Sequence, residues 1–227
     1  MVRKKLLIPI LAAVVASCGG SNLSFSVRGG GSSAAAAAFR SSDLTVASGI
    51  VLTRVRLVLR EIELERVGGN DNDDTDDEKL ESAATVIDLQ GTALDGASIQ
   101  TVVNAAFTPG TYHEIKFKIH KPSSDESTNA AVKEMAALGA SVAVEGKIDG
   151  VDFTFVSAVE AQQKYEGNLV LTDGSNLTLD LNPANWFGAS VAARLDPRVS
   201  GNRSQIESNI KASFHAFKDD DHDGHED

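Results

Sequence analysis

Alternation of apolar and polar residues is the dominant pattern of this chain, and it predicts β-strands. From residue 51 to residue 59 the apolar side chains share one parity while arginines take the other, as in a half-buried strand. Farther on the parity changes to Ile62 and Leu64, which predicts a β-bulge near Arg60. The first part of this strand is expected to turn five residues to the core: Val51, Thr53, Val55, Leu57 and Leu59.

Residues 68–80 interrupt this pattern with glycines and acidic residues, and we expect a long acidic loop that leads to a return strand at 85–89. The clearest alternation of the chain follows at 113–119, after a Pro109-Gly110 turn. Its parity places His113 inward as a hydrogen-bonded core histidine, and His120 at the surface.

Two Asp-Gly turns predict two hairpins. Asp149-Gly150 suits a two-residue type I′ turn, which would pair residues 141–148 with 151–157 and set Gly146 opposite Phe153. Asp173-Gly174-Ser175 would join 168–171 to 176–181 in the same way, with Leu177, Leu179 and Leu181 facing inward.

Helical spacing of apolar residues predicts short helices at 99–106, at 127–138, and at 205–217. Gly139 would end the second of them. Strands with regular turn signals and two or three short helices indicate a mainly β fold, an antiparallel β-sandwich. The Trp186-Phe187 pair is expected to plug its core, the alternative being a sugar-stacking platform.

The first residues resemble a bacterial export signal. Three basic residues precede an apolar run at 6–15, which is too short for a permanent membrane span. Val15-Ala16-Ser17-Cys18 resembles a lipobox, which implies cleavage before Cys18 and lipid on its sulfur. Cys18 is the only cysteine, so a thioether there would also leave no free thiol in an oxidising compartment. An ordinary signal peptide with a chance cysteine is the alternative.

These segments divide the chain into a signal peptide (1–17), a lipidated flexible tether (18–40), a sandwich domain with a C-terminal helix (41–217) and an acidic tail (218–227). Cleavage removes three basic residues and leaves 18 against 32 acidic ones, a formal charge of −14. Such a surface repels nucleic acid and favours cations or basic partners. We expect attachment to a membrane through the lipid, at the outer membrane of the cell envelope because Gly19 and Gly20 follow the cysteine.

The long strand with its bend, the polar insert, the return strand ending Ile87-Asp88-Leu89 and the run from Pro109 to Ile115 resemble one family. This region, roughly 45–155, is similar to the DUF4382 family of bacterial lipoproteins and exported proteins, whose function is unknown. The chain lacks the acidic Asp-Ala-Pro-type start of that family before the first long strand. The resemblance implies export and a β-sandwich, and it implies no activity.

The acidic tail contains the clearest candidate for chemistry. Asp219-Asp220-Asp221-His222-Asp223-Gly224 matches the opening of an EF-hand-type calcium loop, which needs carboxylates at positions 1, 3 and 5 and glycine at position 6. His225 would offer its carbonyl at position 7, and Asp227 stands at position 9, while the glutamate of position 12 is missing. The expected ligands of a weak Ca²⁺ site are Asp219, Asp221, Asp223, His225 and Asp227, the helix ending near Phe217 would enter the loop, and a residue of the 71–78 loop could add a ligand. A solvated acidic tail is the alternative.

Other functions have weaker support in the sequence. His215, His222 and His225 with the tail carboxylates could hold a transition metal. No GxSxG, HExxH or P-loop motif is present, so a hydrolase would need a pair of carboxylates that sequence cannot identify. We therefore expect a non-enzymatic envelope lipoprotein that presents a sandwich to a protein or glycan partner, and a metal-handling protein or a carboxylate-dependent hydrolase are the alternatives.

Overall fold

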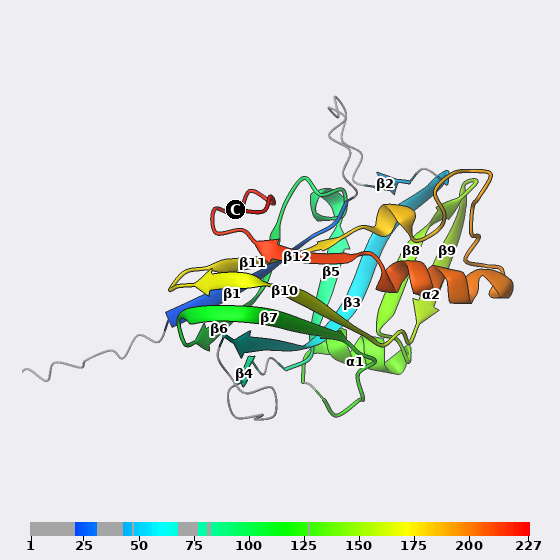
Figure 1. Cartoon of the computed structure of the whole chain (residues 1–227). Coiled ribbons are helices and arrows are strands. Elements are labelled where there is room, and N and C mark those ends of the chain that lie inside the picture. The colour runs from blue at the N-terminus through cyan, green and yellow to red at the C-terminus, as the bar shows by residue number, and fades with distance from the viewer. Residues whose placement is uncertain (1–20, 31–42, 47, 68–76, 81–82, 127) are drawn as a thin grey trace, which may run out of the picture.

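Two β-sheets pack face to face in the computed structural model, which describes residues 21–30, 43–46, 48–67, 77–80, 83–126 and 128–227 (Figure 1). The first sheet has the strand order β12-β11-β1-β6. Its strands are β1 (Ser21–Arg28), β6 (Gln100–Phe107), β11 (Asn176–Leu181) and β12 (Phe214–Lys218). The second sheet has eight strands, among them the path β10-β7-β3-β8-β9. Its strands are β2 (Leu44–Thr45), β3 (Ile50–Arg66), β4 (Asp77–Leu80), β5 (Thr85–Gln90), β7 (Gly110–Ile119), β8 (Val142–Ile148), β9 (Val151–Ser157) and β10 (Ala161–Leu171).

The predicted antiparallel sandwich is confirmed, with one parallel pair, β1 with β11. Side chains of both sheets meet in one hydrophobic core, where the rings of Phe25 on β1 and Phe117 on β7 lie 5.0 Å apart. Trp186 and Phe187 are both completely buried in this core. The pair is therefore a core plug, and the sugar-stacking alternative is wrong.

The 17-residue strand β3 organises the second sheet, since β2, β4, β5, β7 and β8 all pair with it. The predicted bulge is confirmed, because its pairing with β7 shifts register between Leu59 and Glu61. A second shift against β8, between Leu52 and Arg54, was not predicted. Before that shift Ile50 and Leu52 face the core, so the inward placement of Val51 and Thr53 was wrong.

The expected tether begins with a strand. Residues 21–28, which we assigned to a flexible segment, form β1 in the middle of the first sheet, between β11 and β6. Leu23, Phe25 and Val27 are at most 2% exposed. Alternation of these three residues carried the signal, which the neighbouring glycines and serines obscured. The alanine run at 34–38 lies outside the described residues.

The helix expected at 99–106 is also wrong, because the segment forms β6 and pairs antiparallel with β1. Val103, Ala105 and Phe107 point inward at the period of a strand. The register shift between Phe25 and Ser26 of β1 faces the start of this segment, which explains why its apolar residues do not alternate throughout. A short apolar run can fit both the helical and the strand period, and pairing with β1 makes this one a strand.

The second expected helix is confirmed as α1 (Ala130–Ala137), and Gly139 follows it with a φ of +64°. Its buried face consists of Val132 and Met135, which pack in a small separate cluster with Val58 of β3. Helical spacing of Ala131, Met135 and Leu138 predicted the buried face; Met135 is buried as expected, whereas Ala131 and Leu138 are exposed and Val132 is buried instead.

The last predicted helix divides into two elements. α2 (Arg203–Lys211) buries Ile206 and Ile210, and the chain then turns into β12. Phe214 and Phe217 therefore belong to a strand, and not to the apolar stripe of a helix. β12 forms by pairing antiparallel with β11, where Leu181 pairs with Phe214 and Leu177 with Lys218.

The two Asp-Gly turns have different outcomes. β8 and β9 form the predicted hairpin in the predicted register, with Gly146 opposite Phe153. The second turn does not make a hairpin, because β10 pairs with β7 while β11 pairs with β1 and β12. Leu177, Leu179 and Leu181 are buried as expected, but the turn carries the chain from one sheet to the other.

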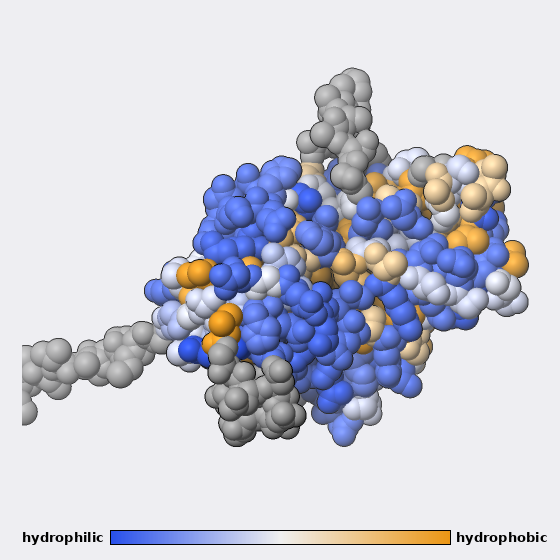
Figure 2. Space-filling model, viewed as in Figure 1, coloured by the Kyte–Doolittle hydropathy of each residue, from blue (hydrophilic) through white to orange (hydrophobic). Residues whose placement is uncertain are grey.

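The visible surface is mostly hydrophilic (Figure 2). Hydrophobic residues are scattered on it, and the exposed large ones in the described chain include Val151 at the β8–β9 turn and Val191 in the loop beside Gly49. Within the described residues, no helix is both long and apolar enough to cross a membrane. The expected signal peptide and Cys18 lie outside the described residues.

Candidate metal centre

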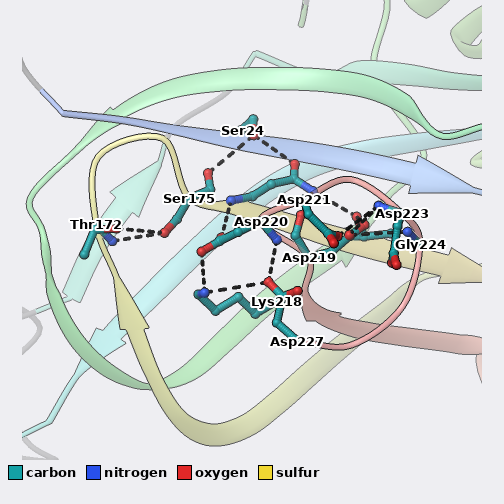
Figure 3. A network of polar contacts seen from close by, with 12 residues as sticks. Ser24, Thr172, Ser175, Lys218, Asp219, Asp220, Asp221, Asp223, Gly224 and Asp227 are labelled. Atoms are coloured by element: carbon teal, nitrogen blue, oxygen red, sulfur yellow. Dashed lines mark hydrogen bonds and ion pairs between the residues drawn. The ribbon is translucent and has the colours of Figure 1, made fainter.

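The acidic C-terminal segment is a closed loop, and it packs against the first sheet. It leaves β12 at Asp219 and lies beside the end of β11 that follows the second Asp-Gly turn (Figure 3). The backbone N–H of Asp227 donates to the carbonyl of Lys218 at 3.1 Å, so the two ends of the loop meet. A strand enters this loop, and the helix that we expected before it is wrong.

Asp219 anchors the loop from inside. Its side chain is completely buried, and its Oδ2 accepts a 2.7 Å hydrogen bond from the hydroxyl of Thr178 on β11. Its Oδ1 accepts the backbone N–H of Asp223 at 3.0 Å and that of Gly224 at 3.3 Å. These three hydrogen bonds satisfy the buried carboxylate, and Oδ2 keeps a lone pair for a cation. A fully solvated tail, our alternative, is therefore excluded for this residue.

A buried polar network beneath the loop explains why it docks there. The side-chain amide of Asn176 on β11 donates to the carbonyl of Asp219 at 2.9 Å and to the hydroxyl of Thr178 at 3.0 Å. Its carbonyl oxygen accepts from the hydroxyls of Ser24 and Ser26 on β1 at 2.8 and 2.9 Å. Buried polar groups need such partners, and the network ties loop and sheet together. Our sequence reasoning missed Asn176 and Thr178, which alternate with the buried leucines of β11 and could have been found as polar residues opposite an apolar face.

Three of the predicted ligands come together. One carboxylate oxygen from each of Asp219, Asp221 and Asp223 lies within 4.8 Å of the other two. Ca²⁺ binds oxygens at 2.3–2.6 Å, so two of its ligands can be at most about 5 Å apart. The three oxygens are thus close enough together to share one metal ion.

The loop backbone makes this convergence possible. Asp221 Oδ1 accepts the N–H of Asp223, and Asp223 Oδ1 accepts the N–H of His225 at 2.8 Å. Gly224 has a φ of +83°, and a Cβ there would lie 2.7 Å from Nη1 of Arg28. The turn therefore favours glycine at position 6, and a side chain there would also have to displace the end of the Arg28 side chain.

The other predicted ligands have different roles in the described loop. Asp227 Oδ2 accepts the backbone N–H of Asp220 at 2.7 Å and lies 3.8 Å from Nζ of Lys218, so it closes the loop instead of joining the cluster. The ring of His225, exposed like that of His222, is not part of the cluster, whose side chains among the described residues are all carboxylates; the backbone carbonyl expected from His225 stays a prediction. Hard oxygen ligands suit Ca²⁺ better than a softer transition metal. Asp71–Asp76 and the side chains of 77 and 78, suggested as a source of a further ligand, lie outside what the structure describes.

Asp220 connects the loop to the turn before β11. Its Oδ1 accepts the backbone N–H of Asn176 at 3.0 Å, and its Oδ2 accepts from Lys218. Burial alone would raise the pKa of Asp220, but the hydrogen bonds from Lys218 and from the Asn176 backbone outweigh it and hold the pKa below 3.8. Asp220 is thus ionised in the folded protein and points away from the three clustered carboxylates (Figure 3).

Of the other histidines singled out from the sequence, His113 lies in β7 and His120 directly follows it, whereas His215 lies in β12 of the first sheet. The ring of His113 is 42% exposed, so its expected place in the core is wrong, although its Nδ1 does lie 3.0 Å from the carbonyl of Arg66. The positions that face the core change parity between Tyr112 and Ile115 of β7. Register shifts of β7 with its neighbours β3 and β10 lie beside this change.

His120 lines a charged cavity of about 750 Å³ at the end of β7. Its two ring nitrogens each lie 3.7 Å from a glutamate, Glu126 on one side and Glu160 on the other. Arg60 pairs with Glu126 at 3.1 Å, and Lys118 with Glu61 at 2.6 Å. Two of the carboxylates here, Glu61 and Glu126, are therefore paired with cationic side chains.

Comparisons with known proteins assign no family. No family model and no curated protein matches this sequence. A solved structure, described as "MbnP from Methylosinus trichosporium", is similar with 13% sequence identity and a TM-score of 0.41, covering 75% of this chain and 78% of that one. The resemblance to DUF4382 stays a prediction.

Proposed function

We propose that this chain is a non-enzymatic lipoprotein of the cell envelope whose β-sandwich serves as an interaction domain, with Ca²⁺ bound in its C-terminal loop. The observation that carries the calcium proposal is the convergence of Asp219, Asp221 and Asp223 within 4.8 Å. The buried network under Asp219 supports it further, because it fixes one ligand before any ion binds.

A Ca²⁺ ion in this loop would act as a clamp. It would offset the repulsion of three carboxylates and join the end of β12 to β11 and β1 through Asp219. With few protein ligands the site should bind weakly, at about 10⁻⁴–10⁻³ M. At a tenfold excess of Ca²⁺ over its dissociation constant, mass action gives a stabilisation of about 1–2 kcal/mol.

Melting temperature in millimolar CaCl₂ against EDTA tests the clamp. The informative variant is Asp221→Asn/Asp223→Asn, since both residues are exposed whereas Asp219 is needed for packing. Asp125→Asn/Asp152→Asn is the matched control, because it removes the same charge from exposed positions outside the loop. We expect a calcium-dependent rise in the parent and the control that is absent from the loop variant. A rise of equal size in all three, or in none, refutes the site, and a rise with ZnCl₂ alone would favour the metal-handling alternative.

The anchor proposal rests on Cys18 and the small residues before it. Mass spectrometry of the protein from a bacterial membrane fraction should find an N-terminus at Cys18 with acyl mass, and Cys18→Ala should lose both. A mature N-terminus at any other residue would contradict lipidation, without bearing on the calcium loop.

A further inference from the structure

The first strand of the sandwich begins close to the residue that would carry the lipid. Ser21 opens β1, and only Gly19 and Gly20 stand between it and Cys18. An extended chain spans at most about 3.3–3.6 Å per residue, so the Cα atoms of Cys18 and Ser21 can be at most about 11 Å apart. The headgroup layer on one side of a bilayer is about 5–8 Å thick, the difference between a hydrocarbon core of about 30 Å and a total of about 40–45 Å shared by two sides. A lipid on Cys18 would therefore hold the start of β1 at the membrane surface.

Several other segments lie at the same end of the molecule as the start of β1 (Figure 1). Ser21 pairs with Phe107 at the end of β6, and the next strand along the chain, β7, begins at Gly110. The 172–175 turn is held there by Asn22, whose backbone carbonyl accepts an N–H of that turn at 2.9 Å. We call this end of the sandwich, with the two valines described next, the anchor end.

Two exposed valines belong to the anchor end. Val67, which follows β3, is 56% exposed, and Val170 near the end of β10 is 55% exposed. The N–H of Val67 donates to the carbonyl of Thr111 at 3.1 Å, and Val170 pairs with Thr111 from the other side, so the valines flank the start of β7. Isolated exposed valines are common on proteins. These two, however, lie at the end that the anchor would bring to lipid, where contact with the membrane interface stabilises apolar side chains.

The charge of the chain selects the kind of lipid. The acidic run at 71–78 closely follows Val67 in the sequence, and acidic residues outnumber Lys and Arg in the whole chain by 32 to 21. Exposed charges act on one another within a Debye length of about 8 Å at physiological ionic strength. Anionic headgroups held against the anchor end are therefore repelled, whereas zwitterionic headgroups are not.

We propose that the anchor end docks on a zwitterionic lipid surface, with Val67 and Val170 in the headgroup layer. The inference rests on the proposed lipid anchor, and it goes further by fixing how the domain stands on the membrane. The 17-residue strand β3 leads away from the bilayer, because its first residue, Ile50, lies beside the β8–β9 hairpin and its last lies next to Val67. The opposite end of the sandwich, which carries Val151 and Val191, lies away from the membrane.

Spin labels measure the docking in the full mature lipoprotein, reconstituted into vesicles of phosphatidylcholine and phosphatidylethanolamine. Val67→Cys and Val170→Cys each offer one thiol for the label, since the sulfur of Cys18 carries the lipid. Val151→Cys and Val191→Cys are the matched controls, because these valines are 56% and 63% exposed at the opposite end. Oxygen concentrates in the bilayer and a nickel chelate stays in water, so the ratio of their effects on a label reports its depth. We expect this ratio to be several-fold higher at the first two positions than at the controls.

Acidic variants test whether the valines themselves make the contact. A label at Thr108→Cys, an exposed residue of the β6–β7 turn, reads the depth of the anchor end without replacing either valine. Val67→Asp/Val170→Asp should lower the ratio at this label several-fold, because ionised carboxylates leave lipid for water. Val151→Asp/Val191→Asp, the same change at the opposite end, should leave it as in the parent. All four valines are more than half exposed, so these substitutions leave the core intact.

Vesicle composition tests the choice of lipid. Replacing part of the phosphatidylcholine with phosphatidylglycerol at low salt should lower the ratio at Val67→Cys and Val170→Cys. A higher ratio in the anionic vesicles would overturn the zwitterionic surface.

The docking proposal is wrong if all four labelled valine positions are equally accessible to the nickel chelate, or if the two acidic double variants behave alike. Mass spectrometry of the same samples separates this failure from a failure of the anchor. Acylated protein with water-exposed labels at Val67→Cys and Val170→Cys refutes the docking alone. Protein without acyl mass refutes the anchor, and the docking falls with it.

Discussion

The two Asp-Gly turns of this protein share a dipeptide and differ in what they connect. Asp149 and Gly150 both have positive φ, +52° and +80°, and they join β8 to β9 as a hairpin in one sheet. In the second turn, of residues 172–175, only Gly174 has a positive φ, +84°, and the strands on either side belong to different sheets.

Contacts distant in sequence account for the difference. Asp173 Oδ1 accepts the backbone N–H of Asn22 at 2.8 Å, and the N–H of Gly174 donates to the carbonyl of Asn22 at 2.9 Å. The start of β1 thus holds the second turn, and β11 then pairs parallel with β1. The first turn is specified by its own two residues, which suit the type I′ geometry. A turn motif therefore predicts a change of direction, whereas strand pairing depends on which partners are available.

The largest expected effect concerns the strand that holds the second turn. Phe25→Ala should cost about 3–5 kcal/mol of unfolding free energy, because the ring is 2% exposed and packs on Phe117 across the two sheets. Urea unfolding measures the loss. Val170→Ala, at a valine that is 55% exposed, is the control and should change little. A Phe25→Ala variant as stable as this control would return residues 21–28 to the tether that we expected from sequence.

An intermediate effect is expected in the locally specified hairpin. A Cβ at Gly146 would lie 2.9 Å from the ring of Phe153 and even closer to the backbone oxygen of Val51, so Gly146→Val should cost about 1–3 kcal/mol. Chemical denaturation of this variant beside Gly201→Val provides the test, since Gly201 has nothing within 4 Å of such an atom. Equal midpoints for the two variants would show that the register of this hairpin is wrong.

The smallest effect on stability is expected for Asp220, which accepts a hydrogen bond from the backbone N–H of Asn176, the residue after the 172–175 turn. The pKa of this carboxyl is lowered below 3.8 in the folded protein, as Lys218 and the Asn176 N–H outweigh its burial. Its contribution to stability is therefore present above a pH near 3.8 and is lost as the pH falls through the folded pKa. Because the side chain is 38% exposed, the contribution should stay below about 1 kcal/mol.

Melting curves of Asp220→Asn and the parent should differ at pH 7 and converge at pH 2. Asp152→Asn, whose side chain is 85% exposed, should match the parent at both values. A difference for Asp220→Asn that persists unchanged at pH 2 would mean that its carboxylate charge has no part in the effect.

Local patterns anticipated much of the second sheet and of the candidate site. The bulge near Arg60 and the register of β8 with β9 followed from alternation and turn chemistry, and both are seen. The convergence of Asp219, Asp221 and Asp223 followed from the spacing of a loop with glycine at its sixth position. These features depend on residues that are close in sequence. For such residues the local backbone geometry alone sets the relative positions of the side chains.

Tertiary structure decided which segments form the strands of the first sheet. β1, β6 and β12 were read as tether and helices, and each became a strand by pairing with a neighbour distant in the chain. Short apolar runs fit both periods, so the backbone hydrogen bonds that a partner strand supplies determine the outcome. Burial of Asp219 depends in the same way on Asn176 and Thr178, which the sequence separates from it by about forty residues. By itself the sequence determined the turns, the bulge near Arg60 and a cluster of carboxylates, whereas pairing between distant segments decided which strands form the sandwich and where that cluster lies.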